Sequence, residues 1–257
     1  MKKLFATLLA LALLASCCAA IAEAPKFEGA GYDSPEAAVE AYIEAFNAGD
    51  VWGMLSTFAI ETAVDHMDQK AAIQRIGAWQ STIREGAPVF NGYSRDLAVA
   101  QRVGAITNAL NSSMLTYAWP EDFNTFDGMP VHFNGDDADA RIDAFLGGFA
   151  ASDFAGWIGQ VALERFVTAE DLGVGEAYFN ESSQTNLARF AKACGCDELE
   201  ERAAILNAAG RQYVQFMQCV RYGDRWYNYS QMPMLAHVCS IDVTTGGLVA
   251  LPDSDAR

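Results

Sequence analysis

The chain has 257 residues, of which 51% are hydrophobic and 19% are charged, and its formal net charge is −16. This apolar fraction is sufficient for a packed core, and the length suits one domain with an insertion or two small domains. The negative charge argues against nucleic acid and anionic lipid headgroups as partners, because both require cationic side chains on the protein.

Residues 1–22 predict an export signal. Two lysines precede an apolar stretch from Leu4 to Ala15, and small residues follow it. Three forms of processing are open: release after Ala22, lipid modification of Cys17 in a lipobox-like sequence, and an uncleaved anchor. All three place the folded part outside the cytoplasm, secreted or in the cell envelope, with membrane contact only through the leader or a lipid on Cys17. Loss of both lysines would change the net charge of −16 to −18.

A short linker over residues 23–33 precedes a single domain that we place at residues 34–245. The linker has Gly and Pro but no hydrophobic periodicity. Ser34, followed by a proline, begins the domain as a helix cap. Asp50 is the expected cap of a second helix, and apolar residues at helical spacing predict a third over residues 71–79.

A helical insertion is predicted over about residues 81–154. One helix starts at Ser94 and extends to Met114, with its apolar residues on one side. A loop rich in Pro, Gly and Asn follows. Asp136 then begins another helix, whose apolar residues include Phe145.

Three further elements follow the insertion. Residues 157–167 fit neither period cleanly and favour a strand. The sequence Thr-Ala-Glu-Asp at residues 168–171 has the pattern of a helix start, with an acidic residue in the capping-box position. Apolar residues at helical spacing predict a helix over residues 187–194.

A β-hairpin is predicted near the C-terminus. Tyr213–Tyr222 alternates between its two faces, and Gly223-Asp224 is a two-residue turn into the return strand Arg225–Ser230. Residues 246–257 are assigned to a C-terminal tail. Helices early in the chain and antiparallel strands late in it predict an α+β fold.

Two parts of the chain carry a family resemblance. Residues 34–42 (SPEAAVEAY), 48–50 (AGD) and 54–55 (ML) predict two helices that meet at a Gly-Asp corner, and residues 220–227 (VRYGDRWY) predict a hairpin with a Gly-Asp turn. Together they resemble the nuclear-transport-factor-2-like (ketosteroid-isomerase-like, cystatin-like) fold. The resemblance implies N-terminal helices packed on a C-terminal curved antiparallel sheet, in a fold that carries enzymes, binding modules and assembly domains alike. The whole chain also resembles a group of uncharacterised exported proteins of gut-type Gram-positive bacteria.

Aromatic residues of the hairpin are the candidate ligand-binding residues. Tyr213, Trp226 and Tyr227 could line a groove, although hairpin aromatics also pack across strands. The enzymes of the resembled fold use an acid or base with a Tyr donor, which makes Asp65 and His66 candidates together with Tyr213 or Tyr227. The alternative for Asp65 and His66 is a solvated helix end.

Four cysteines lie beyond the leader, and their state is open. An extracytoplasmic location admits disulfides among them, with three possible pairings. A four-thiolate zinc site and buried free thiols are the alternatives. The four residues are Cys194, Cys196, Cys219 and Cys239.

No motif for a nucleophilic serine, a phosphate loop, a histidine metal site or a cofactor is present. The sequence therefore predicts no metal or cofactor and favours a non-catalytic role. We expect an exported domain that binds a small ligand, an envelope component or a protein partner. The alternative is a ketosteroid-isomerase-like or dehydratase-like enzyme with an acid–base pair in a pocket.

Overall fold

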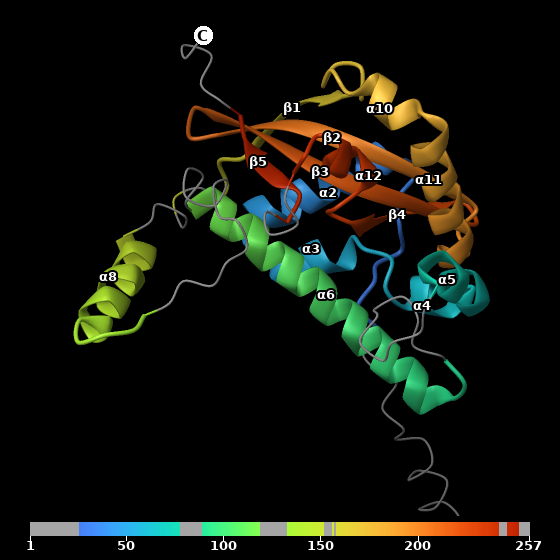
Figure 1. Cartoon of the computed structure of the whole chain (residues 1–257), viewed down its shortest axis with the longest axis horizontal. Coiled ribbons are helices and arrows are strands. Elements are labelled where there is room, and N and C mark those ends of the chain that lie inside the picture. The colour runs from blue at the N-terminus through green and yellow to red at the C-terminus, as the bar shows by residue number, and fades with distance from the viewer. Residues whose placement is uncertain are drawn as a thin grey trace, which may run out of the picture.

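A computed structural model describes residues 26–77, 89–118, 133–151, 156, 158–241 and 246–251. The helices in these ranges are α2 (Pro35–Asn47), α3 (Val51–Ser56), α4 (Glu61–His66), α5 (Gln69–Ile76), α6 (Gly92–Ala118), α8 (Ala138–Ala151), α10 (Gly175–Phe179), α11 (Glu181–Cys194) and α12 (Met234–Val238). The strands are β1 (Ala162–Val167), β2 (Glu198–Ala208), β3 (Arg211–Tyr222), β4 (Arg225–Ser230) and β5 (Leu248–Ala250). The fold is α+β, as predicted (Figure 1).

The predicted caps of the first two helices are confirmed. The Ser34 hydroxyl accepts the N–H of Ala37 at 3.1 Å, at the start of α2. The Asp50 carboxylate accepts the N–H of Gly53 at 2.8 Å, at the start of α3. These bonds satisfy backbone donors that have no partner within a helix, so the local sequence determines where each helix begins.

The sheet is antiparallel, with strand order β1-β2-β3-β4, and β5 pairs with β3. β2 and β3 pair along their whole length, from Glu198 opposite Arg221 to Ala208 opposite Arg211. The other edge of β3 is shared between β4 and β5. The predicted hairpin of β3 and β4 is confirmed, with its turn at Gly223-Asp224.

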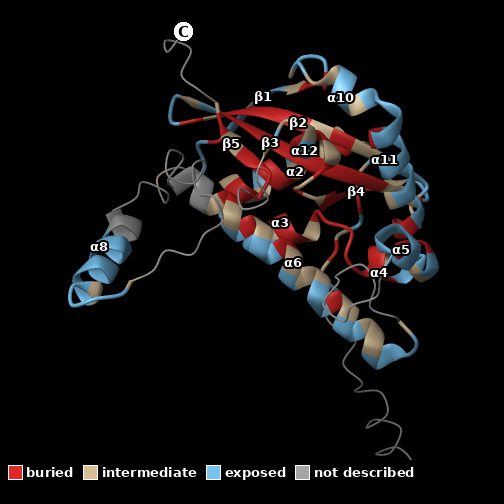
Figure 2. Ribbon diagram, in the orientation of Figure 1, coloured by how far each residue is buried: buried red, intermediate tan, exposed pale blue. Residues whose placement is uncertain are grey.

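Helices cover both faces of this sheet, and the buried residues concentrate in the strands and on the helix sides that face them (Figure 2). On one face, Phe46 of α2 and Phe58 share a core with Tyr213 and Met217 of β3. On the other face, Phe216 of β3 packs with residues of β2 and α12, which include Ile205 and Leu235. The central strands are therefore buried on both sides.

The helix α6 belongs to the core, whereas α8 lies apart from the sheet (Figure 1). Val99, Ile106 and Leu110 of α6 are buried against α2 and the sheet. The helix begins at Gly92, two residues before the predicted start, because Asn91 accepts the N–H of Ser94 at 2.9 Å and acts as the cap. No helix in the described ranges combines the length and apolar character needed to cross a membrane.

The helix predicted to start at residues 168–171 is absent at that place. Thr168 and Asp171 exchange hydrogen bonds instead: the N–H of Thr168 donates to Asp171 Oδ2 at 2.9 Å, and the N–H of Asp171 donates to Thr168 Oγ1 at 3.2 Å. The result is a closed turn, and Gly173 at φ +73° redirects the chain before α10 begins at Gly175. Residues with the pattern of a capping box therefore form a turn here that no helix directly follows.

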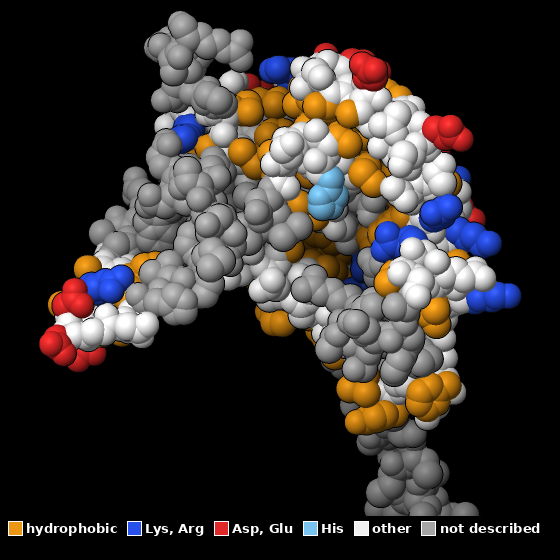
Figure 3. All heavy atoms as spheres, in the orientation of Figure 1, with side chains coloured by type: hydrophobic (Ala, Val, Ile, Leu, Met, Phe, Trp, Pro, Cys, Tyr) orange, Lys and Arg blue, Asp and Glu red, His pale blue; other side chains and the backbone are white. Residues whose placement is uncertain are grey.

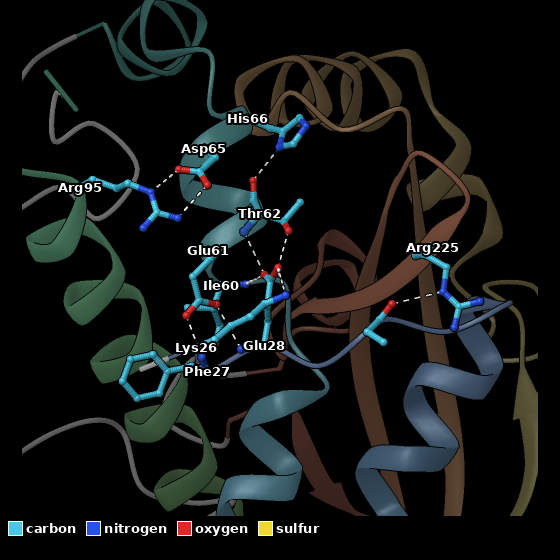
Figure 4. Close-up of polar contacts among 11 residues, drawn as sticks. Lys26, Phe27, Glu28, Ile60, Glu61, Thr62, Asp65, His66, Arg95 and Arg225 are labelled. Atoms are coloured by element: carbon cyan, nitrogen blue, oxygen red, sulfur yellow. Dashed lines mark hydrogen bonds and ion pairs between the residues drawn. The ribbon is translucent and has the colours of Figure 1, made fainter. Parts of the chain in front are cut away.

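The segment predicted as a linker is held to the domain by hydrogen bonds from Lys26 onward (Figure 4). The Glu28 carboxylate accepts the N–H groups of Ile60 and Thr62 at 2.8 and 2.9 Å. In return, the Glu61 carboxylate accepts the N–H groups of Phe27 and Glu28 at 2.7 and 3.1 Å. At the other end of the chain, β5 places part of the segment assigned to a tail in the sheet.

Candidate functional site

A groove of about 790 Å³ lies between strand β2 and the helices α10 and α11. It is lined by the end of β1, the turn after it, one side of α10 and α11, and the first half of β2. The helices α2 and α12 each add one residue, Glu36 and Leu235.

The groove exists because β1 is shorter than β2. β1 pairs with β2 as far as Val167, opposite Ala203, and the chain then turns away at residues 168–171. Residues 198–202 of β2 pair with β3 on one edge, and no described strand lies along their other edge. The helices that follow the turn form the opposite wall (Figure 1).

The unpaired edge presents backbone groups of Leu199 and Glu201. In β3, the N–H of Phe216 donates to the carbonyl of Gly247 at 2.7 Å, on the side away from β2. Successive residues of a strand direct their backbone groups to opposite edges, so Phe216 and its partner Ala203 form a non-hydrogen-bonded pair. The same alternation along β2 directs the N–H and C=O of Leu199 and Glu201 outward, into the groove.

The Glu201 side chain is buried at the base of the groove and joins β2 to α12. Its carboxylate accepts the N–H groups of Met234 and Leu235, each at 2.8 Å, and the Gln218 amide at 3.0 Å. The Tyr178 side chain of α10 also stabilises this carboxylate. Burial raises the pKa of Glu201, and these donors oppose the rise by stabilising the carboxylate.

The rim of the groove is acidic. Arg202 Nε binds Glu36 at 2.6 Å, its Nη2 binds Glu200, and its Nη1 donates to the Glu201 carbonyl at 3.0 Å. Arg202 is the one cation among the described lining residues, which include six carboxylates. Those six are Glu36, Glu170, Asp197, Glu198, Glu200 and Glu201. The groove therefore has a negative potential, which favours a cationic ligand.

The helix wall is mostly apolar. One side of α11 faces the groove with Leu187, Ala188 and Ala191, at the spacing of a helix face. α10 adds the rings of Tyr178 and Phe179, and Phe179 is 55% exposed. In the face shown by Figure 3, acidic side chains lie along α10 and the start of α11, and basic side chains gather near α5. A ligand would thus contact apolar side chains on one wall and charges on the other.

The three predicted ligand-binding aromatics lie elsewhere. Tyr213 is fully buried in the core beneath α2, and Trp226 belongs to the same core. Tyr227 lies on the other face of the sheet with Tyr222 and Tyr229. None of the three lines the groove. Their role in this structure is packing across and between strands.

Asp65 and His66 do not form a pocket with Tyr213 or Tyr227. Asp65 is bound by the guanidinium of Arg95 through Nε and Nη2, at 2.6 and 2.7 Å (Figure 4). His66 Nδ1 lies 2.9 Å from the carbonyl of Thr62, one helical turn earlier, and its ring lies 4.9 Å from that of Tyr222. Both residues are exposed, as expected for a solvated helix end.

Cys194, Cys196, Cys219 and Cys239 form no disulfide in this structure, so of the alternatives left open by the sequence it shows neither the disulfides nor the zinc site among the described residues. Cys219 is buried in the core beneath α2, whereas Cys194 lies on the opposite face of the sheet. Cys196 packs beside Cys194, and Cys239 packs near α12. Among the described residues, no group of His, Cys, Asp or Glu side chains could hold a metal ion.

Sequence reasoning missed the groove because its residues come from separate segments of the chain. The sequence Glu-Leu-Glu-Glu-Arg at residues 198–202 carries four charges, which is atypical of a strand. Only the ladder with β3 shows that these residues form an edge. The sequence at residues 168–171 predicts a helix start, and nothing in it indicates that the turn formed there ends β1 at Val167.

No protein-family model matches the sequence, and no curated protein is similar to it. A solved structure with similarity is a cystatin-like protein from Ruminococcus gnavus ATCC 29149. The two are 14% identical with a TM-score of 0.39, and the similarity covers 76% of this chain and 39% of the other. At this level the similarity shows neither a family nor an activity.

Proposed function

We propose that this protein is an exported, non-catalytic binding domain whose ligand occupies the groove beside β2. The observation that carries the proposal is the groove itself, a space of about 790 Å³ next to unpaired backbone groups. A volume of this size suits a small ligand or a short peptide segment. The export signal predicted from residues 1–22 supports a location outside the cytoplasm.

The alternative, a ketosteroid-isomerase-like enzyme, needs an open pocket between the early helices and the sheet. That space is occupied by Tyr42, Phe58 and Tyr213, and α6 adds Ile106 and Leu110. All five side chains are buried. A packed core at this place favours a binding role at the groove over catalysis between α2 and the sheet.

The test fills the groove without disturbing the core. Ala188 is exposed and lines the groove, so Ala188→Trp places a large ring in it. Asn186 lies on the other side of α11, is exposed and does not line the groove, so Asn186→Trp is the matched control. Ligand-observed NMR of the processed protein would screen alkylamines, aromatic carboxylates, cell-wall sugar fragments and short peptides.

We expect at least one class of probe to bind the parent and the Asn186→Trp variant but not the Ala188→Trp variant. Binding that survives in the Ala188→Trp variant would place the ligand elsewhere. No binding by any class of probe would contradict the proposed function.

A further inference from the structure

We infer that the groove binds an extended segment of a partner protein, which adds as a strand to the outer edge of β2 and alternates basic and apolar side chains. This inference rests on the proposed binding role of the groove and names the class of its ligand. It is carried by three independent features: the unpaired backbone edge, the different character of the two sides, and the charge.

The edge offers the hydrogen bonds of strand addition. The N–H and C=O of Leu199 and the N–H of Glu201 point outward and have no strand partner in the described ranges. A segment laid along residues 198–202 would continue the line of β1, which ends at Val167. Five strand residues extend about 17 Å. This mode of recognition draws affinity from backbone bonds and specificity from alternate side chains.

The two sides of the edge differ, and the difference predicts the sequence of the segment. Side chains of an added strand alternate between the two faces of the sheet. On the face of Leu199 they would meet Leu187 and Ala191 of α11. On the face of Glu200 they would meet carboxylates, which include Glu36. Apolar residues therefore suit the first face, and lysine or arginine suits the second.

The negative charge of the groove favours a basic segment of another protein over a second copy of this chain. Six carboxylates line the groove with one guanidinium, which is bound to Glu36 and Glu200, and Arg221 outside the lining binds Glu198 at 2.9 Å, so acidic groups remain in excess. Pairing two copies through this edge would bring Glu198 and Glu200 of each close to the same residues of the other, and like charges oppose such pairing. The formal charge of −16 on each chain adds to that repulsion.

The probe is a capped heptapeptide that alternates valine and lysine, titrated into the processed protein by calorimetry. We expect binding that Ala188→Trp weakens at least about tenfold, because the ring fills the space of the apolar side chains. Glu170 lines the groove and is exposed, so Glu170→Lys should weaken binding about fivefold. Asp143→Lys on α8 makes the same change in net charge away from the groove and should leave binding unchanged.

Backbone methylation of the peptide tests strand addition itself. Amides of an added strand point alternately toward β2 and away from it, so methylating one amide should abolish binding and methylating the next should be tolerated. A peptide that alternates valine and glutamate should not bind. Equal effects of methylation at both amides, or equally tight binding of spermidine, would mean that charge alone is recognised and would overturn the inference.

The outcomes separate this inference from the proposed function. If the peptide fails to bind while another probe binds in a manner that Ala188→Trp abolishes, the groove is a binding site and the inference about its ligand is wrong. If neither the peptide nor any other probe binds, both the proposed function and this inference are wrong. Circular dichroism of each variant checks that its fold is retained before the titrations are compared.

Discussion

Position 247 requires a glycine because of both its backbone conformation and the atoms around it. Its φ is +74°, and a Cβ at this position would lie 1.7 Å from the carbonyl oxygen of Gln231. Gly247 also accepts the N–H of Phe216 through its own carbonyl, so it cannot move away without breaking the contact of β5 with β3.

We predict that Gly247→Ala lowers the free energy of unfolding by about 3 kcal/mol or more, from a left-handed conformation and a backbone clash together. Gly223→Ala is the matched control, because Gly223 has φ +63° with nothing within 4 Å of the added Cβ. It should lose only about 1 kcal/mol. Urea unfolding measures both, and equal losses would show that the contact with Gln231 contributes nothing.

Glu28 stabilises the start of α4 from a distant part of the sequence. Its buried carboxylate accepts N–H groups of Ile60 and Thr62 and the Thr62 hydroxyl. Glu28→Ala should lower the free energy of unfolding by about 3 kcal/mol, since buried donors lose their partner. Glu40 is exposed on α2, and Glu40→Ala should change stability by less than about 0.5 kcal/mol. Similar stabilities for the two variants would contradict the role of Glu28.

At the scale of elements, the carboxylate of Glu201 couples β2 to α12, and this coupling depends on pH. Burial raises the pKa of Glu201 above its value in the unfolded chain, which is about 4.3. The folded state therefore holds the proton to higher pH than the unfolded state does. The stability that Glu201 contributes is present in full below about pH 4.3 and declines as pH rises through the folded-state pKa.

Glu201→Gln removes this titration. We predict that the stability of the parent relative to this variant declines as the pH is raised from about 4.3, because only the parent must ionise a buried group. Chemical unfolding at a series of pH values measures it. A difference that stays constant with pH, or that increases, would contradict a raised pKa at Glu201.

Elements with a complete local signal were predictable from the sequence. Ser34 and Asp50 cap their helices through residues three positions later, and the Gly223-Asp224 turn joins strands that adjoin it. Elements that depend on tertiary contacts were not. The segment after Lys26 resembled a linker because Glu61, whose carboxylate accepts its backbone N–H groups, lies 33 residues from Glu28. The groove could not be predicted from the sequence for the same reason, because its walls come from distant segments that meet only in the folded sheet.

At the scale of the whole molecule, the sheet separates Cys219 from the other three cysteines beyond residue 22. Cys219 lies on one face, and Cys194, Cys196 and Cys239 lie on the other side of the fold. Burial raises the pKa of Cys196 to about 11, and burial raises the pKa of Cys239 and Cys219 as well. These three cysteines therefore hold little reactive thiolate near neutral pH.

We predict that protein prepared without residues 1–22 reacts slowly with a chromogenic disulfide reagent at pH 8, and that all four of its thiols react rapidly in denaturant. The half-buried Cys196 and Cys239 should react before the buried Cys194 and Cys219. Fewer than four titratable thiols in unreduced, denatured protein would reveal a disulfide and contradict the structure, in which these four cysteines form none.

Strand addition at the outer edge of β2 is the binding mode that we propose for the groove. Amide hydrogen exchange, followed by NMR with and without the valine–lysine peptide, tests it most directly. Glu198, Glu200 and Arg202 serve as internal references, because their amides already bond to β3. We predict that the peptide slows exchange at Leu199 and Glu201 and leaves the exchange of the three reference amides unchanged. Unaltered exchange at Leu199 and Glu201 in the presence of bound peptide would contradict it.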